Sequence, residues 1–293
     1  MKKSNLILVI LLFASAFIML IVGCKKDDKA DTAETIVSAE DNSTAESELT
    51  SMFDVGDDFS SNDTRTRAGN TILPSGAIVT WQDSTFNDSN GVECTIDFGP
   101  LKSSTPKGLL CQDGRYRSGK VHISLSKRYM YDGAVMTIWA TEADLFYAGN
   151  DGVNLTQVSG NVKITRLTQT SLQIDVTNAK AVNDKGTVTW QSTRVITKTV
   201  DAGPGILGDQ FEITGSASGV SRTGENFTVT IDKPLVKKVE QGCARTFIIG
   251  KVTLKNTTSG KTISIDYDPF SNGACDLTAK ATVNGKEFIY TVR

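Results

Sequence analysis

Few side chains in this sequence could do chemistry, and they are scattered along the chain. His122 is the only histidine among the 293 residues, so nucleophilic catalysis with an imidazole base would have to use it. It stands between Val121 and Ile123, and the alternation of that segment places it on the solvent-facing side of a strand. A solvated strand histidine is the simpler interpretation. We therefore expect no catalytic residue and no enzymatic activity.

Acid–base chemistry by paired carboxylates is the alternative, as in glycoside hydrolysis, where two carboxyl groups lie about 5–9.5 Å apart. Four aspartates stand on the solvent-facing side of expected strands or at their ends: Asp97, Asp175, Asp266 and Asp268. Aspartates in such positions more often cap turns or pair with Lys and Arg. A surface glycoside hydrolase is therefore the second hypothesis, behind a binding role.

The cysteines indicate structural disulfide bonds rather than a metal site. Apart from Cys24, discussed below, there is an even set of Cys94, Cys111, Cys243 and Cys275. An even set in an oxidising compartment indicates disulfides. We favour Cys94–Cys111 and Cys243–Cys275, because each closes the shorter loop, with free buried thiols as the alternative. The chain has no CxxC pair and one histidine, so we expect no metal site and no other cofactor.

Exposed aromatic side chains are the remaining means of binding a ligand. Tyr129 and Tyr131 flank Met130 at the expected end of a strand, where both tyrosines would lie on the same side. The three tryptophans could also stack on a sugar, but aromatic residues of a β domain more often belong to its core. The tyrosine pair therefore predicts a patch that binds an extracellular glycan or protein.

The elements that must position these residues are β-strands. From Ala77 onward apolar and polar residues alternate, most clearly over residues 92–98, 121–126 and 263–267. Asn284-Gly285 supplies the positive φ angles of a tight hairpin turn. The pattern predicts an all-β fold over residues 76–293, an antiparallel meander that closes into a sandwich or barrel-like roll. An extended single sheet is the architectural alternative.

The segment that precedes these strands, residues 24–75, has a different composition. From Lys25 onward it carries five basic and twelve acidic side chains and few large apolar ones, which is typical of a flexible tether. One stretch near residues 43–55 predicts a short helix, either docked on the folded domain or transient. Its apolar side chains recur on one helical face: Ala45, Leu49, Met52 and Phe53.

The N-terminus indicates export and a lipid anchor. Lys2 and Lys3 precede an uncharged apolar run of 17 residues, Leu6–Val22, and small Gly23 then precedes Cys24. The arrangement resembles the bacterial lipobox, in which the cysteine is acylated and becomes the mature N-terminus. This interpretation makes residues 1–23 a signal peptide. A transmembrane helix is the alternative, but 17 residues is the short limit for a span.

The residues after the cysteine suggest an address. Lys26-Asp27-Asp28 resembles the short signal that sends lipoproteins of the Bacteroidetes to the outer face of the outer membrane, with an ordinary solvated linker as the alternative. We expect an outer-membrane protein that is lipid-anchored through Cys24 and exposed at the cell surface. A formal net charge of −2 and this location both argue against nucleic acid as a partner.

Several motifs along residues 76–293 resemble, in type and order, a family of Bacteroidetes surface lipoproteins that has no assigned activity. The resemblance therefore implies the anchor and the location but no mechanism. We expect a non-enzymatic binding or structural module, with an accessory subunit of an outer-membrane assembly as a further alternative. The resemblance is carried by Thr95-Ile96-Asp97-Phe98-Gly99, Cys111, Asp113-Gly114-Arg115, Arg117-Ser118-Gly119-Lys120, Ile265-Asp266-Tyr267 and Cys275-Asp276.

Overall fold

A computed structural model describes residues 29–61, 73–86, 90–202, 208–238, 247–276, 278–283 and 285–291. Antiparallel strands in chain order follow one N-terminal helix, which confirms the predicted all-β meander and the helix. The contacts divide the chain, which was expected to form one β domain, into two compact units. Unit 1 comprises residues 1–47 and 190–293, and unit 2 comprises residues 48–189.

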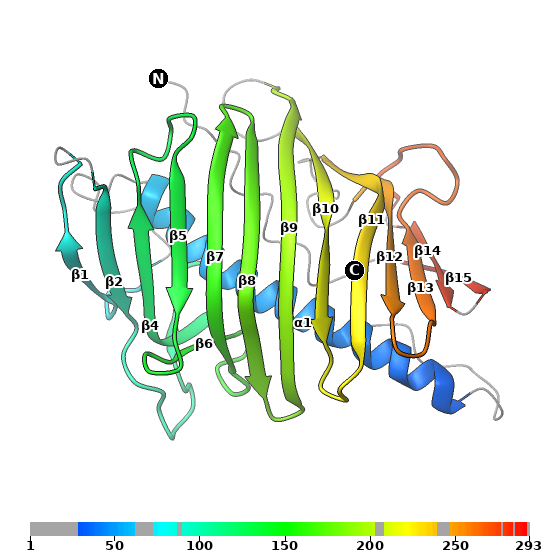
Figure 1. Cartoon of the computed structure of the whole chain (residues 1–293), viewed down its shortest axis with the longest axis horizontal. Helices are drawn as coiled ribbons and strands as arrows, with labels where there is room; N and C mark the ends of the chain where they lie inside the picture. The colour runs from blue at the N-terminus through cyan, green and yellow to red at the C-terminus, as the bar shows by residue number, and fades with distance from the viewer. Residues whose placement is uncertain are drawn as a thin grey trace. The chain divides into compact units, whose positions relative to one another are not determined.

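Unit 2 contains a sheet whose main strands follow the order β1-β2-β4-β5-β7-β8 (Figure 1). The short β6 pairs with one end of β4 and with β7, while β5 pairs with the other end of β4. Thus β5 and β6 share one place in the sheet. The bounds are β1 Ile78–Asp83, β2 Val92–Asp97, β3 Leu109–Leu110, β4 Tyr116–Leu125, β5 Val135–Ala140, β6 Phe146–Gly149, β7 Thr156–Thr168 and β8 Ser171–Asn183.

Unit 1 contains most of β9 and all later strands, again ordered as in the chain. Its strands pair through hairpins, and β11 carries register shifts near Lys233. The bounds are β9 Gly186–Val200, β10 Gln210–Val220, β11 Asn226–Lys238, β12 Ile249–Asn256, β13 Thr262–Asp266, β14 Thr278–Val283 and β15 Lys286–Thr291.

Within each unit the described strands form an open path, as in the extended sheet that was the architectural alternative. No pair among them joins β1 to β8 or β10 to β15. A sandwich, a barrel and an open sheet share the same alternation of apolar and polar residues, so the sequence pattern did not separate them. The buried sheet face is met here by a helix, α1, rather than by a second sheet.

Helix α1 spans Lys29–Ser61 and is longer than the predicted helix. Over residues 38–56 most of its described side chains are buried, so this part of the expected tether is packed structure. In unit 2 its Met52 and Phe53 are almost fully buried, and Ser60 Oγ lies 2.8 Å from Met136 Sδ of β5. Burial of this apolar stripe stabilises a helix whose average composition is polar. The described helix is not apolar enough to span a membrane.

In unit 1 the helix is held by polar contacts. These contacts satisfy groups that would otherwise be buried without partners. Burial raises the pKa of Glu46 and of Asp41 in spite of their arginine partners. The contacts are Trp190 Nε1 to Asn42 Oδ1 at 2.8 Å, Arg194 to Glu46 at 3.2 Å, and Arg222 to Asp41 and Glu40 at 2.6 and 2.7 Å.

Candidate functional site

Two predicted site residues, Cys24 and Cys243, lie outside the described residues, so their lipidation and pairing stay predictions. The favoured Cys94–Cys111 disulfide is wrong, because both thiols are free and buried. Cys94 faces Ile123 near one end of β4, whereas Cys111 follows a strand that pairs with the other end. At a rise of about 3.4 Å per residue these places are roughly 25 Å apart, beyond the reach of a disulfide.

The described cysteines comprise one that is bridged and two that are free thiols. Cys275 is disulfide-bonded, and the other half of its bridge lies outside the described residues. Burial raises the pKa of the Cys94 thiol to about 12 and also raises the pKa of Cys111. Both therefore stay protonated and act as small apolar side chains in the core of unit 2.

The predicted tyrosine patch does not form. Tyr129 is 4% exposed, and its ring lies 4.7 Å from the guanidinium of buried Arg166, whereas Tyr131 is 56% exposed. The tyrosines lie in a turn, in which Tyr131 N donates to Arg128 O and Ala134 N to Tyr131 O. The two-residue alternation of a strand does not apply in a turn, so the prediction that both tyrosines lie on the same side was wrong.

Three of the four aspartates of the hydrolase hypothesis accept hydrogen bonds from backbone N–H groups. Asp97 Oδ1 accepts from Gly99 N at 2.7 Å, and Asp266 Oδ1 accepts from Asp268 N at 3.0 Å. Asp268 Oδ1 in turn accepts from the backbone of Asn272. The first two contacts are Asx turns at strand ends and the third closes a longer turn, which is the structural role that the sequence also allowed.

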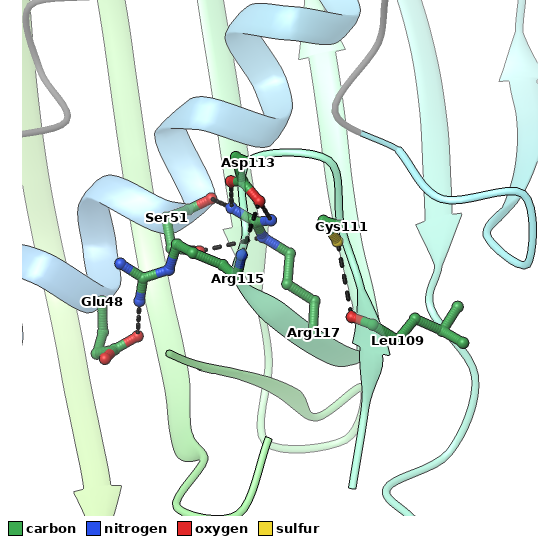
Figure 2. A network of polar contacts seen from close by, with 7 residues as sticks. All are labelled: Glu48, Ser51, Leu109, Cys111, Asp113, Arg115 and Arg117. Carbon is green, nitrogen blue, oxygen red and sulfur yellow. Dashed lines mark hydrogen bonds and ion pairs between the residues drawn. The ribbon is translucent and has the colours of Figure 1, made fainter. Parts of the chain in front are cut away.

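The densest polar network in unit 2 surrounds Arg117 of β4 (Figure 2). Its side chain is fully buried and forms a bidentate ion pair with Asp113, with N···O distances of 2.9 and 2.6 Å. Arg117 Nε also donates to Ser51 Oγ of α1 at 3.1 Å. Burial alone would lower the pKa of Arg117, but the carboxylate of Asp113 outweighs it and raises that pKa.

A second arginine extends this network to the helix. Arg115 pairs with Glu48 of α1 at 2.6 Å, as Figure 2 shows. Asp113 Oδ1 accepts from the backbone of Arg115, and Gly114, with φ of 82°, allows the tight turn between them. Burial raises the pKa of Glu48 and raises that of nearby Asp54 to about 7. The network is enclosed, so it is suited to fixing α1 on the sheet rather than to meeting a substrate.

The accessible candidate site lies on the opposite, solvent-facing side of the unit 2 sheet. Strand pairing aligns one residue from each of six strands into a transverse row, which we call the His122 row. In the four central strands the positions on either side of the row are buried, so the row lies on the outer face of the sheet, where Thr95 is the most enclosed member at 9% exposure. The row consists of Thr80, Thr95, His122, Trp139, Asn161 and Thr177.

His122 is the centre of the contacts in this row. Its ring stacks on Trp139 with centroids 5.3 Å apart and an interplanar angle of 15°. His122 Nδ1 lies 3.0 Å from Thr95 Oγ1, and Nε2 lies 3.1 Å from Asp144 Oδ2. Gln82 Nε2 donates to the same threonine oxygen at 2.9 Å. The histidine side chain keeps 18% of its surface exposed, so solvent and ligands reach it.

Sequence reasoning placed His122 correctly on the wet face but missed its partners. Asp144 lies in the loop between β5 and β6, and a loop has no strand alternation from which to predict the sheet face of a side chain. The backbone N of Asp144 donates to Thr141 Oγ1 at 2.9 Å. Gln82 lies at a register shift of β1, so strand pairing did not predict its position either. The one available signal was the antiparallel register, which brings Thr95 and Trp139 to either side of the histidine.

Unit 1 contains a cavity of about 40 Å³. It lies between α1 and the inner face of β11–β13, with Glu46 and Arg194 in its wall. That volume accommodates a few water molecules and is too small for a sugar ring. No group of three or more metal-ligating side chains gathers among the described residues.

Comparisons with protein families, with curated proteins and with solved structures found no match.

Proposed function

We propose that this protein is a lipid-anchored, outer-membrane surface protein whose His122 row binds an extracellular glycan. The location rests on the charged and apolar segments before Cys24 and on Lys26-Asp27-Asp28. Acylation of one cysteine by more than one chain would hold the protein stably on the membrane, since each buried CH₂ contributes about 0.8 kcal/mol.

The observation that carries the binding role is the stacked pair of His122 and Trp139 on an outward sheet face. Hydroxyl and amide groups flank the pair, with Thr95 on one side and Asn161 on the other. Sugars present apolar C–H faces and rings of hydroxyl groups, so aromatic rings next to neutral donors and acceptors suit them. The row runs across six strands of one sheet face, which fits an extended chain better than a single small molecule.

The other hypotheses have less support from the contacts. A glycosidase would need two free carboxylates facing each other, and three of the four candidate aspartates accept backbone hydrogen bonds in turns. An accessory subunit would need a broad contact surface, and no contact among the described residues favours that role over ligand binding at the His122 row. We therefore place binding first.

Glycan binding is tested on a glycan array with the protein lacking residues 1–23, followed by titration of each hit. Trp139→Ala should weaken binding at least tenfold, about 1.4 kcal/mol, while Tyr131→Ala serves as the matched control because Tyr131 is exposed in a turn away from the row. Equal loss in both variants, or no glycan bound by the wild type, would contradict the binding role.

The anchor is tested separately in cells. Cys24→Ser should move the protein from the membrane to the soluble fraction and abolish incorporation of labelled fatty acid. Digestion of intact cells by an added protease should remove the wild-type protein if it faces outward. Retention of Cys24→Ser in the membrane would favour the transmembrane alternative.

A further inference from the structure

Three side chains of the unit 2 face stand in the order required for acyl transfer: a hydroxyl, an imidazole and a carboxylate. Thr95 Oγ1 lies 3.0 Å from His122 Nδ1, and Asp144 Oδ2 lies 3.1 Å from His122 Nε2. A nucleophile, a base and a group that orients the base are recognised by such distances and roles rather than by sequence position. We propose that Thr95, His122 and Asp144 form a nucleophilic relay that cleaves small acyl esters.

The neighbouring contacts fix the direction of the proton transfer. Gln82 Nε2 is a donor only, so Thr95 Oγ1 accepts from it at 2.9 Å and has its own proton free for His122 Nδ1. A carboxylate at Nε2 favours the tautomer that carries its proton there. Nδ1 is then the unprotonated nitrogen beside the hydroxyl, as a general base requires.

The same surroundings hold the relay in place. Trp139 stacks on the imidazole, and Thr141 Oγ1 accepts from the backbone N of Asp144 at 2.9 Å. Lys120 Nζ lies 3.5 Å from Asp144 Oδ1, but this pair is well exposed and contributes little. The relay residues thus come from two strands and one loop, and each is held by at least one further contact, from Gln82, Trp139 or Thr141.

The reaction balances without a cofactor. Thr95 Oγ attacks the ester carbonyl carbon while Nδ1 of His122 takes the hydroxyl proton, and the carbonyl oxygen becomes an oxyanion beside the Gln82 amide. The C–O bond to the leaving alcohol then breaks, and the alkoxide takes the proton from Nδ1. Water, deprotonated by the same nitrogen, hydrolyses the acyl-threonine, which releases the carboxylic acid and restores the hydroxyl.

This inference goes beyond the binding role and departs from the expectation of a non-enzymatic protein. It shares a sheet face with the proposed glycan site, so its test uses p-nitrophenyl acetate, which contains no sugar. Binding and ester cleavage can then fail independently.

The experiment measures p-nitrophenolate release by the wild-type protein and four variants. Thr95→Val and His122→Asn should each lower the rate at least 100-fold, and Thr95→Ser, which keeps the hydroxyl, should stay within tenfold of wild type. Thr230→Val, on an exposed position of β11 in unit 1, is the matched control and should leave the rate unchanged.

A fluorophosphonate probe followed by peptide mass spectrometry locates the nucleophile. The expected adduct lies on Thr95 and is absent after Thr95→Val. A wild-type rate equal to that of buffer would overturn the relay. So would a Thr95→Val rate within twofold of wild type in a variant whose far-ultraviolet circular dichroism is unchanged, or an adduct confined to other residues.

Discussion

Arg117 shows how one buried charge can hold several parts of unit 2 together. Its guanidinium satisfies both oxygens of Asp113 and the hydroxyl of Ser51, so removing it would leave a carboxylate in a place with 9% side-chain exposure. A buried pair is weak evidence for net stabilisation, yet breaking it by removing one partner is costly.

We predict that Arg117→Met lowers the free energy of unfolding by about 3–5 kcal/mol, because Asp113 loses its counter-ion. Lys180→Met, which removes an exposed pair with Glu142, should change it by less than about 1 kcal/mol. Urea unfolding followed by tryptophan fluorescence measures both. Similar small effects in the two variants would mean that Asp113 finds another partner or water.

Asp54 should make unit 2 sensitive to pH. Its pKa in the folded protein is about 7 because burial penalises the charged form, whereas an unfolded aspartate titrates near 3.9. The folded state therefore holds the proton more tightly, so stability is fully present below about pH 4, falls as pH rises towards 7 and then levels off.

Asp54→Asn removes this titration. The stability of the variant relative to wild type should increase between pH 4 and pH 7, by roughly 4 kcal/mol as an upper limit. Urea unfolding at pH 4, 5.5, 7 and 8 gives the difference at each pH. A difference that stays constant across this range would show that Asp54 does not titrate there.

At the scale of elements, β4 organises unit 2 because it pairs with β2, β3, β5 and β6 and carries both Arg117 and His122. Between them stands Gly119, where β6 passes so closely that a Cβ atom would overlap the Leu145 carbonyl oxygen. The next residue to the N-terminal side of Leu145 is Asp144, so this close approach also positions the carboxylate of the relay.

Gly119 and Gly114 form a matched pair for testing the close contact between Gly119 and the start of β6. Both have φ of 82°, so alanine costs roughly 1–2 kcal/mol at either place. Gly114→Ala meets nothing within 4 Å, whereas Gly119→Ala also meets backbone and should lose roughly 1–3 kcal/mol more. Thermal unfolding gives the comparison, and equal shifts of Tm would mean that β6 moves away without cost.

At the scale of the whole molecule, the contacts divide the chain into two compact units, and the sequence predicts an acylated cysteine before them. The free thiols of Cys94 and Cys111 and the bridge of Cys275 give these units different redox properties. Only the bridge should respond to a reductant, since the two thiols lie in the core of unit 2.

We predict that the protein shows two titratable thiols after unfolding without reductant, Cys94 and Cys111, and none in the native state, provided that Cys24 is acylated as proposed. Reduction should add two more and lower stability by about 2–4 kcal/mol, as for one disulfide. A chromogenic thiol reagent and mass spectrometry measure the count. Four thiols before reduction would exclude the bridge with Cys243.

The sequence by itself determined the strands, because the alternation of side chains depends only on local geometry and on one buried face. It placed Cys94 and Ile123 inside and His122 outside. It also predicted a helix around Met52 and Phe53 from their spacing. The anchor at Cys24 stays a prediction, since that segment lies outside the described residues.

Only the tertiary structure decided which distant groups meet. The partners of His122 include Asp144 in a loop, and the partners of Arg117 include Ser51 in the predicted helix, whose docking the sequence left open. The cysteine pairing failed for the same reason, because loop length says nothing of where a residue lies along its neighbouring strand. Local patterns fix which face a side chain takes, but register and long-range packing fix what it touches.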